Sequence, residues 1–287
     1  MNIKTGTLTK NLLAFSVLMS IFSMNSFADN SSLEPLYSKS GQVYSDITID
    51  AALGYYNGRE LEEIKDIDAY EVLMDITVPV FDNTQLRFTW PAYTDGSGTL
   101  KNNGDIHDGQ STDIKGNGGT YEFMTLSLEY QLKSAADQDY NLLVYGGFGG
   151  RATWLETTYD DNLNHNGSLV KFGARYDRSL TSDSKVFATL EYRYYWDTDD
   201  INPANDNGTS FNIINLSGAW VWQSSAALSP VVELMYSTDV KSYHALSVVP
   251  EVIYTINPAV DIKLGAPIGI SSDADTYGVR LGVTTRF

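Results

Sequence analysis

The 287-residue sequence contains no cysteine, which excludes disulfides, thiolate metal sites, cysteine nucleophiles and a lipid-modified N-terminal cysteine. An exported protein without disulfides needs another source of stability. A closed β-barrel is one solution, because closure pairs the backbone hydrogen-bonding groups of the whole sheet.

Basic residues are scarce, with 19 Lys and Arg against 36 Asp and Glu and a net charge of −17. This balance argues against nucleic-acid binding, which needs a basic face, and against adsorption to anionic lipid through a polybasic patch. Long apolar runs are missing too. After residue 28 no window holds 18 consecutive apolar residues, so membrane-spanning helices are not expected.

Residues 1–28 have the features of a secretory signal peptide. Lys4 and Lys10 form a positive n-region, Leu12 to Met24 form an apolar h-region, and small residues at positions 26 and 28 predict cleavage after Ala28. The alternative is a single membrane anchor, for which the stretch is too short and too rich in serine.

The remaining sequence is a series of alternating segments separated by turn residues. An even number of strands, each about 10–17 residues long, suits a single-chain outer-membrane barrel. The twelve expected strands are Gln42–Gly58, Ala69–Phe81, Thr84–Tyr93, Gly119–Lys133, Tyr140–Glu156, Gly167–Leu180, Lys185–Thr198, Phe211–Gln223, Ala226–Val240, His244–Ile256, Val260–Ser271 and Thr276–Phe287.

The alternation gives each strand one apolar and one polar face. In Lys185–Thr198, Leu190 and Tyr194 share the apolar face, whereas Glu191 and Arg193 share the other face. A soluble β-sandwich would show the same period, so other features have to decide between the two folds.

The first deciding feature is the length of the connectors. Five short ones, at Asp82-Asn83, Ser134–Asp139, Thr181–Ser184, Ser224-Ser225 and Asn257–Ala259, interleave with the longer Arg59–Asp68, Thr94–Gly118, Thr157–Asn166 and Asp199–Ser210. Short periplasmic turns and longer outer loops are typical of barrels. The last two outer connectors, Lys241–Tyr243 and Ser272–Asp275, are short and weaken the pattern.

The second feature is a double band of aromatic residues, because Tyr and Trp favour the membrane–water interface. Those expected at the outer ends of the apolar faces are Tyr55, Trp90, Trp154, Tyr194, Trp196 and Tyr236. Those expected at the periplasmic ends are Tyr130, Trp220, Trp222, Tyr254 and Phe287.

The third feature is the end of the chain, where apolar residues at every second position lead to a final Phe287. This pattern resembles the targeting signature of bacterial outer-membrane barrels, and it implies recognition of the last strand by the barrel-assembly machinery. Together the three features predict an all-β fold, a closed antiparallel transmembrane barrel of about 12 strands.

Two segments carry a narrower resemblance. The run DNTQLRFTWP at residues 82–91 and the closing residues 257–287 resemble the outer-membrane group of phenol-degradation or aromatic-pathway transporters. The resemblance covers about a quarter of the chain and implies the passage of small molecules.

Charged residues on the polar faces are expected to point into the lumen, because a charge facing lipid near the midplane costs a few kcal/mol. The basic candidates are Arg87, Arg151, Lys171, Arg175, Arg193, Lys263, Arg280 and Arg286. The acidic candidates are Asp50, Asp75, Glu129, Asp177, Glu191, Glu233, Glu251 and Asp261. These groups either line a narrow polar channel and set its selectivity, or pair across strands and fill the interior.

The surplus of acidic residues lies in the outer connectors and predicts a hydrated surface, cation attraction to the mouth, or divalent-ion bridges to the outer leaflet. No spacing identifies a metal site or a cofactor site. Catalytic candidates are few. His165 and Ser168 point to opposite faces of a strand, and Asp66 and Asp68 with Asp105 and His107 form only a loose likeness to omptin proteases.

We therefore expect a signal peptide at 1–28, a short periplasmic segment at 29–41 and a transmembrane barrel at 42–287, located in the outer membrane. The expected function is a passive channel for small solutes without cofactor or catalysis, in contact with outer-membrane lipid and lipopolysaccharide. The alternatives are a closed structural or surface-interaction barrel and, third, an omptin-like or phospholipase-like hydrolase.

Overall fold

The computed structural model describes residues 33–60, 64–101, 109–116, 123–150, 155–157, 167–196, 210–225 and 227–287. The expected signal peptide lies outside these ranges. No helix within them is long and apolar enough to cross a membrane.

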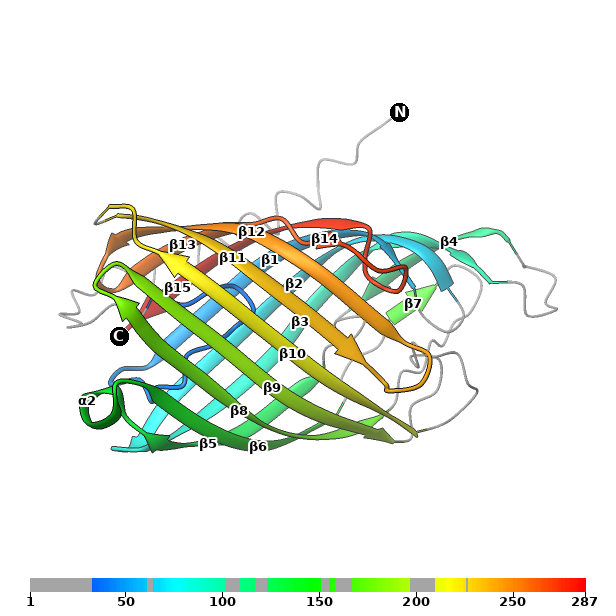
Figure 1. Ribbon diagram of the computed structural model, residues 1–287. Helices are drawn as coiled ribbons and strands as arrows, with labels where there is room; N and C mark the ends of the chain where they lie inside the picture. Colours follow the sequence, from blue (N-terminus) through cyan, green and yellow to red (C-terminus); the bar gives the residue numbers. More distant parts are fainter. Residues whose placement is uncertain are drawn as a thin grey trace.

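The described residues form one antiparallel sheet and one short helix, α2 (Ala135–Gln138) (Figure 1). The strands are β1 (Thr48–Arg59), β2 (Ile64–Phe81), β3 (Thr84–Leu100), β4 (Ser111–Gly116), β5 (Met124–Lys133), β6 (Asn141–Gly150), β7 (Leu155–Thr157), β8 (Ser168–Thr181), β9 (Ser184–Trp196), β10 (Ser210–Trp222), β11 (Leu228–Thr238), β12 (His244–Asn257), β13 (Val260–Gly265), β14 (Ile268–Gly269) and β15 (Tyr277–Arg286).

The sheet closes on itself as a twelve-stranded barrel, as the sequence predicts, with β13 and β14 acting as one strand of the wall. The first and last strands pair antiparallel over their length, from Thr48 opposite Arg286 to Asn57 opposite Tyr277. The backbone amide of Phe287 continues the seam by donating to the carbonyl of Ile47 at 3.0 Å. Closure removes the unpaired edges that an open sheet would expose.

The two faces of the wall have the polarity predicted from the alternation. Leu190 on β9 is 51% exposed on the outside of the isolated chain, whereas its neighbour Glu191 is 7% exposed and points inward. The same alternation sets Phe172 against Lys171 on β8 and Leu264 against Lys263 on β13. The exposed apolar face is the one that meets lipid, and the core of this protein is the polar lumen.

The five short connectors expected on the periplasmic side and the C-terminus lie at one end of the barrel, which we call the turn end; β4 and β7 lie at the opposite end, the loop end (Figure 1). The predicted connector Ser134–Asp139 contains α2. The Ser134 side chain caps α2 by accepting from the Ala136 amide at 3.3 Å, and Asp139 ends the helix in a left-handed conformation.

The aromatic residues near the strand ends are largely exposed on the outer face. Tyr130, Trp220, Trp222 and Tyr254 are exposed near the turn end, Tyr194 is exposed in the loop-end half of β9, and Trp90 is exposed near the middle of β3. The expected Trp154 lies outside the described residues. The arrangement suits rings that sit at the two interfaces of a bilayer.

Two outer connectors are shorter than expected, because β2 begins at Ile64 and β3 continues to Leu100. β4 pairs with the end of β3 and with β7, so the hairpin extends beyond the wall. Glycine and acidic residues favoured a loop here, but buried Ile64, Ile67 and Ile114 pack together with Tyr56 and Ala69 and supply a local core.

The first strand also differs from the prediction, since β1 begins at Thr48 and not at Gln42. Residues 33–47 have no strand or helix and lie within the barrel against inward-facing side chains. We call these residues the N-terminal plug. They include the described part of the segment expected at 29–41.

Candidate functional site

The lumen is the candidate site, and its turn-end half is occupied by the N-terminal plug. Wall residues bind the plug through its backbone amides. Leu36 donates to Glu251 at 3.1 Å, Tyr37 and Ser38 both donate to Glu233, Gly41 donates to Asp177 at 2.7 Å, Val43 donates to Gln131 at 2.9 Å and Tyr44 donates to Gln85 at 2.8 Å. Five strands of the wall therefore hold an irregular segment that makes no ladder of its own.

The plug also folds on itself around Glu34, which is 1% exposed. The carboxylate accepts from the Ser40 amide and from the Tyr44 hydroxyl, both at 2.6 Å, and Lys39 lies 3.6 Å away. Burial raises the pKa of Glu34, but Lys39 and nearby cations outweigh burial and hold that pKa below its usual value. Lys39 joins the plug to the wall through Asp50 at 3.2 Å.

A buried charge cluster lies beside the plug on β3, β5 and β8. Glu129 is fully buried and accepts from Arg87 at 2.9 Å, from Arg175 at 2.8 Å and from Gln85 at 2.6 Å. Two guanidinium groups therefore share one carboxylate. Asp75 lies 4.0 Å from Arg87 and gives a weaker second partner.

The other inward charges form pairs around the barrel. Glu191 contacts Arg193 at 2.5 Å and accepts from the Tyr145 hydroxyl at 2.8 Å. Lys263 lies 3.6 Å from Asp50, and Arg286 lies 2.7 Å from Asp261.

The structure thus places the candidates Arg87, Glu129, Lys171, Arg175, Glu191, Arg193, Glu233, Glu251, Lys263 and Arg280 on the inner side of the wall; Arg151 lies outside the described residues. At least five of these ten pair with one another, namely Arg87, Glu129, Arg175, Glu191 and Arg193. Glu233 and Glu251 instead accept plug amides, and neither forms an ion pair within the described ranges.

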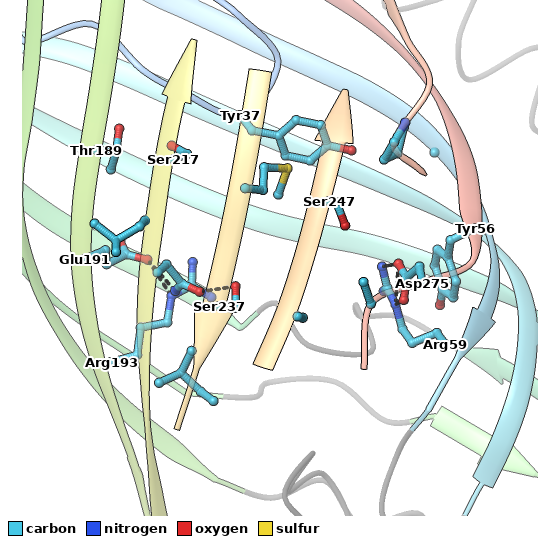
Figure 2. A pocket seen from close by; sticks show the side chains of 18 of the residues that line it. Tyr37, Tyr56, Arg59, Thr189, Glu191, Arg193, Ser217, Ser237, Ser247 and Asp275 are labelled. Carbon is cyan, nitrogen blue, oxygen red and sulfur yellow. Dashed lines mark hydrogen bonds and ion pairs between the residues drawn. The ribbon is translucent and has the colours of Figure 1, made fainter. Parts of the chain in front are cut away.

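A cavity of about 360 Å³ lies above the plug and extends to Tyr243 and Asp273 at the loop end. Tyr37 and Lys39 of the plug line it on the turn-end side. Figure 2 shows Glu191 and Arg193 on one side of this cavity and Arg59 with Asp275 on another. Arg59 and Asp275 are joined by a 2.7 Å ion pair that links β1 to the last loop-end connector.

Aromatic side chains form part of the cavity wall near the loop end. Tyr195 and Phe211 both line the cavity, and their rings stack at 4.5 Å between centroids. Tyr195 also packs edge to face against Phe123 at 5.4 Å. The cavity therefore combines a charged side with an apolar, aromatic side.

Sequence reasoning missed several of these residues. Arg59 and Asp275 were assigned to connectors, and Tyr37 and Lys39 preceded the first expected strand. The sequence does indicate the position of Tyr195 and Phe187, because both lie on the polar face of their strand together with Glu191 and Arg193. Aromatic residues in the inward register indicate packing inside the lumen, and both side chains are buried.

No protein-family model and no curated protein matches this sequence. Solved structures do match. The translocator domain of the autotransporter NalP from Neisseria meningitidis covers 98% of this chain and 96% of its own, with 12% identity and a TM-score of 0.55. An outer-membrane channel from Pseudomonas putida F1 covers 91% of this chain and 100% of its own, with 14% identity and a TM-score of 0.51. The transport unit of the autotransporter AIDA-I from Escherichia coli covers 96% of both chains, with 7% identity and a TM-score of 0.51.

These similarities concern the fold alone, since each of these solved structures is less than 25% identical to this sequence. The chain has the fold of the outer-membrane β-barrels. The resemblance to aromatic-pathway transporters and the targeting role of Phe287 stay predictions.

Proposed function

We propose that the protein is an outer-membrane channel for small solutes, whose path the N-terminal plug narrows. The observation that carries the proposal is the cavity, which extends from the loop end of the lumen down to the plug. A solute that enters from the loop end reaches Tyr37 and Lys39 and can go further when the plug moves. The lumen charges then line the path and set its selectivity.

The way the plug is held supports its displacement. Backbone amides supply many of its hydrogen bonds to the wall, each of which water could replace at a small net cost of about 0.5–1.5 kcal/mol, or about 1.5–3 kcal/mol for a charged acceptor. The plug also makes apolar contacts: Val43 packs in a buried cluster with Leu143 and Tyr145, and Leu33 packs against the cluster around Phe187.

A closed structural barrel is the second candidate. It is favoured by the plug and the Arg87–Glu129–Arg175 cluster, which together occupy the turn-end half of the lumen. Catalysis ranks third, because His165 and Ser168 are expected on opposite faces of a strand; His107 and His165 lie outside the described residues. Asp68 is hydrogen-bonded to Asn57, and Ile67 beside it is buried in a packed cluster.

The two main candidates can be separated by locking the plug. Ser38 of the plug and Ser217 of β10 contact each other through their hydroxyl groups at 2.9 Å. The variant S38C/S217C should form a disulfide, and the absence of native cysteine makes that bond the only one possible. In planar lipid bilayers the oxidised variant should conduct poorly, and reduction should restore the conductance of the unmodified protein.

A matched control links two wall strands without touching the plug. Asn215 on β10 and Ser237 on β11 are direct cross-strand partners with a 2.7 Å side-chain contact. N215C/S237C should conduct equally before and after reduction. Equal conductance of oxidised and reduced S38C/S217C would show that passage does not need plug movement. Absence of conductance in the unmodified and reduced proteins would establish the closed barrel.

A further inference from the structure

Arg280 on β15 differs from the other basic residues around the cavity. Five basic side chains line the cavity: Lys39, Arg59, Arg175, Arg193 and Arg280. The first four pair with carboxylates at 3.2, 2.7, 2.8 and 2.5 Å respectively. Arg280 forms no ion pair with any described residue, and its Nε atom is buried without a hydrogen-bond partner.

Around Arg280 the Tyr37 side chain contacts the guanidinium group, and Glu71 and Asp75 attract it from beyond ion-pair distance. Its cross-strand neighbours are Gly54 on β1 and Gly265 on β13, so neither adjacent strand presents a side chain beside it. A methyl group on Gly54 would make ordinary van der Waals contact with the Glu71 carbonyl oxygen at 3.9 Å, whereas the Leu36 side chain fills the space at Gly265. On the turn-end side the guanidinium carbon lies 4.7 Å from the centre of the Tyr37 ring.

An unpaired guanidinium in a partly enclosed site is unfavourable unless a partner of opposite charge completes it. Arginine presents a planar array of donors that matches a carboxylate or another oxyanion. Because no described carboxylate lies within ion-pair distance of Arg280, this residue indicates where the polar end of a ligand would bind.

The opposite side of the cavity indicates the rest of the ligand. Tyr195 and Phe211 stack on each other and present apolar surface to the same space that Arg280 lines. The volume of about 360 Å³ falls within the range of about 300–1,000 Å³ that small-molecule sites have. A ligand that uses both sides carries an anionic group at one end and an apolar or aromatic body at the other.

We infer that the cavity is a binding site for small amphipathic organic anions, with Arg280 binding the oxyanion and Tyr195 and Phe211 contacting the apolar body. The inference rests on the proposed function, since such a site gives the channel its preferred solute. Binding of such an anion can also be measured in a protein that does not conduct.

The test compares three probes on the purified, detergent-solubilised full barrel by isothermal titration calorimetry. Benzoate has a ring and a carboxylate, acetate has only the carboxylate, and benzamide has only the neutral ring. Benzoate should bind more tightly than acetate and benzamide. In R280Q the affinity for benzoate should fall about tenfold to a hundredfold, the loss expected for a charge-assisted hydrogen bond.

The matched control is Arg178, an exposed residue near the turn-end limit of β8. R178Q should bind benzoate like the unmodified protein, and R280K should lie between the unmodified protein and R280Q because a lysine keeps the charge but loses the planar array. Heat-modifiable migration on denaturing gels should show that each variant is folded. Equal affinity of R280Q and R178Q for benzoate would overturn the inference, as would equal affinity for benzoate and benzamide.

The same samples distinguish this inference from the proposed function. Benzoate binding that depends on Arg280, in a protein that never conducts, would keep the site and defeat the channel. Conductance that benzoate does not alter, together with no calorimetric binding, would keep the channel and defeat the site.

Discussion

Removing the carboxylate of Glu129 tests whether the turn-end half of the lumen is dry and filled. In E129A, Arg175 loses its ion-pair partner, and Arg87 retains only Asp75 at 4.0 Å. Arg87 is 2% exposed, and its two terminal nitrogens already have no hydrogen-bond partner. Breaking a buried pair in this way costs about 3–5 kcal/mol, because it leaves an uncompensated buried charge.

The assay is urea unfolding of the barrel in lipid vesicles, followed by tryptophan fluorescence. The control is E60A, which removes the partner of Lys101 at the loop end. That pair has a 3.1 Å contact, but the Glu60 side chain is 60% exposed, so its loss should cost no more than about 1 kcal/mol. E129A should therefore unfold at a clearly lower urea concentration than E60A.

A triple variant separates charge from packing. Replacing Arg87 and Arg175 with methionine and Glu129 with leucine removes the whole cluster and keeps similar volume. Such a replacement is often neutral or stabilising by about 1–4 kcal/mol, because the cost of burying the charges disappears. If E129A is as stable as E60A, water screens the cluster, the lumen is wet at this level, and the reasoning from burial is refuted.

Three further outcomes are expected. F287A should slow insertion into the outer membrane while leaving the folded barrel stable, because the Phe287 amide that donates to Ile47 survives the change; an unchanged rate of appearance in outer-membrane fractions would contradict the targeting role. L190R, on the lipid face in the middle of β9, should destabilise the barrel by about 2–4 kcal/mol, whereas L180R, at the turn-end limit of β8, should cost about 0–1 kcal/mol; equal urea midpoints would count against lipid exposure. Burial raises the pKa of Asp239 in the loop after β11, but amides of Tyr243, Lys241 and Ser242 outweigh it and lower that pKa. The stability that Asp239 contributes is complete above its unfolded pKa of about 3.9 and is lost as pH falls through the folded pKa, so D239N should show a shallower loss of stability in acid.

The wall of the barrel could be predicted because its physical cause is local. Neighbours such as Leu190 and Glu191 reveal a two-residue period, and lipid on one side and lumen on the other convert that period into a face. Inward placement of Arg175 and Glu129 followed for the same reason. The turn at Asp82-Asn83 was equally visible, because those residues favour turns between two alternating runs.

The N-terminal plug could not be predicted because its contacts are remote. Leu36 binds Glu251, 215 positions further along the chain, and residues 33–47 show no period that would indicate a partner. The length of the β2–β3 hairpin could not be predicted for a different reason. Its glycine and acidic residues are typical of loops, and the burial that stabilises it arises only when Ile64, Ile67 and Ile114 meet.

The plug also affects the balance of positive and negative charges in the lumen. The basic and acidic lumen candidates are equal in number, yet Arg87 and Arg175 share Glu129 on one side of the barrel. On another side Glu233 and Glu251 occupy adjacent strands and accept hydrogen bonds from the plug amides of Leu36, Tyr37 and Ser38. An amide carries a partial positive charge and moves with the plug. Departure of the plug would therefore leave a surplus of negative charge at β11 and β12. The two arginines that share Glu129 give the opposite, positive surplus at β3 and β8. The charge selectivity of the lumen therefore depends on the position of the plug.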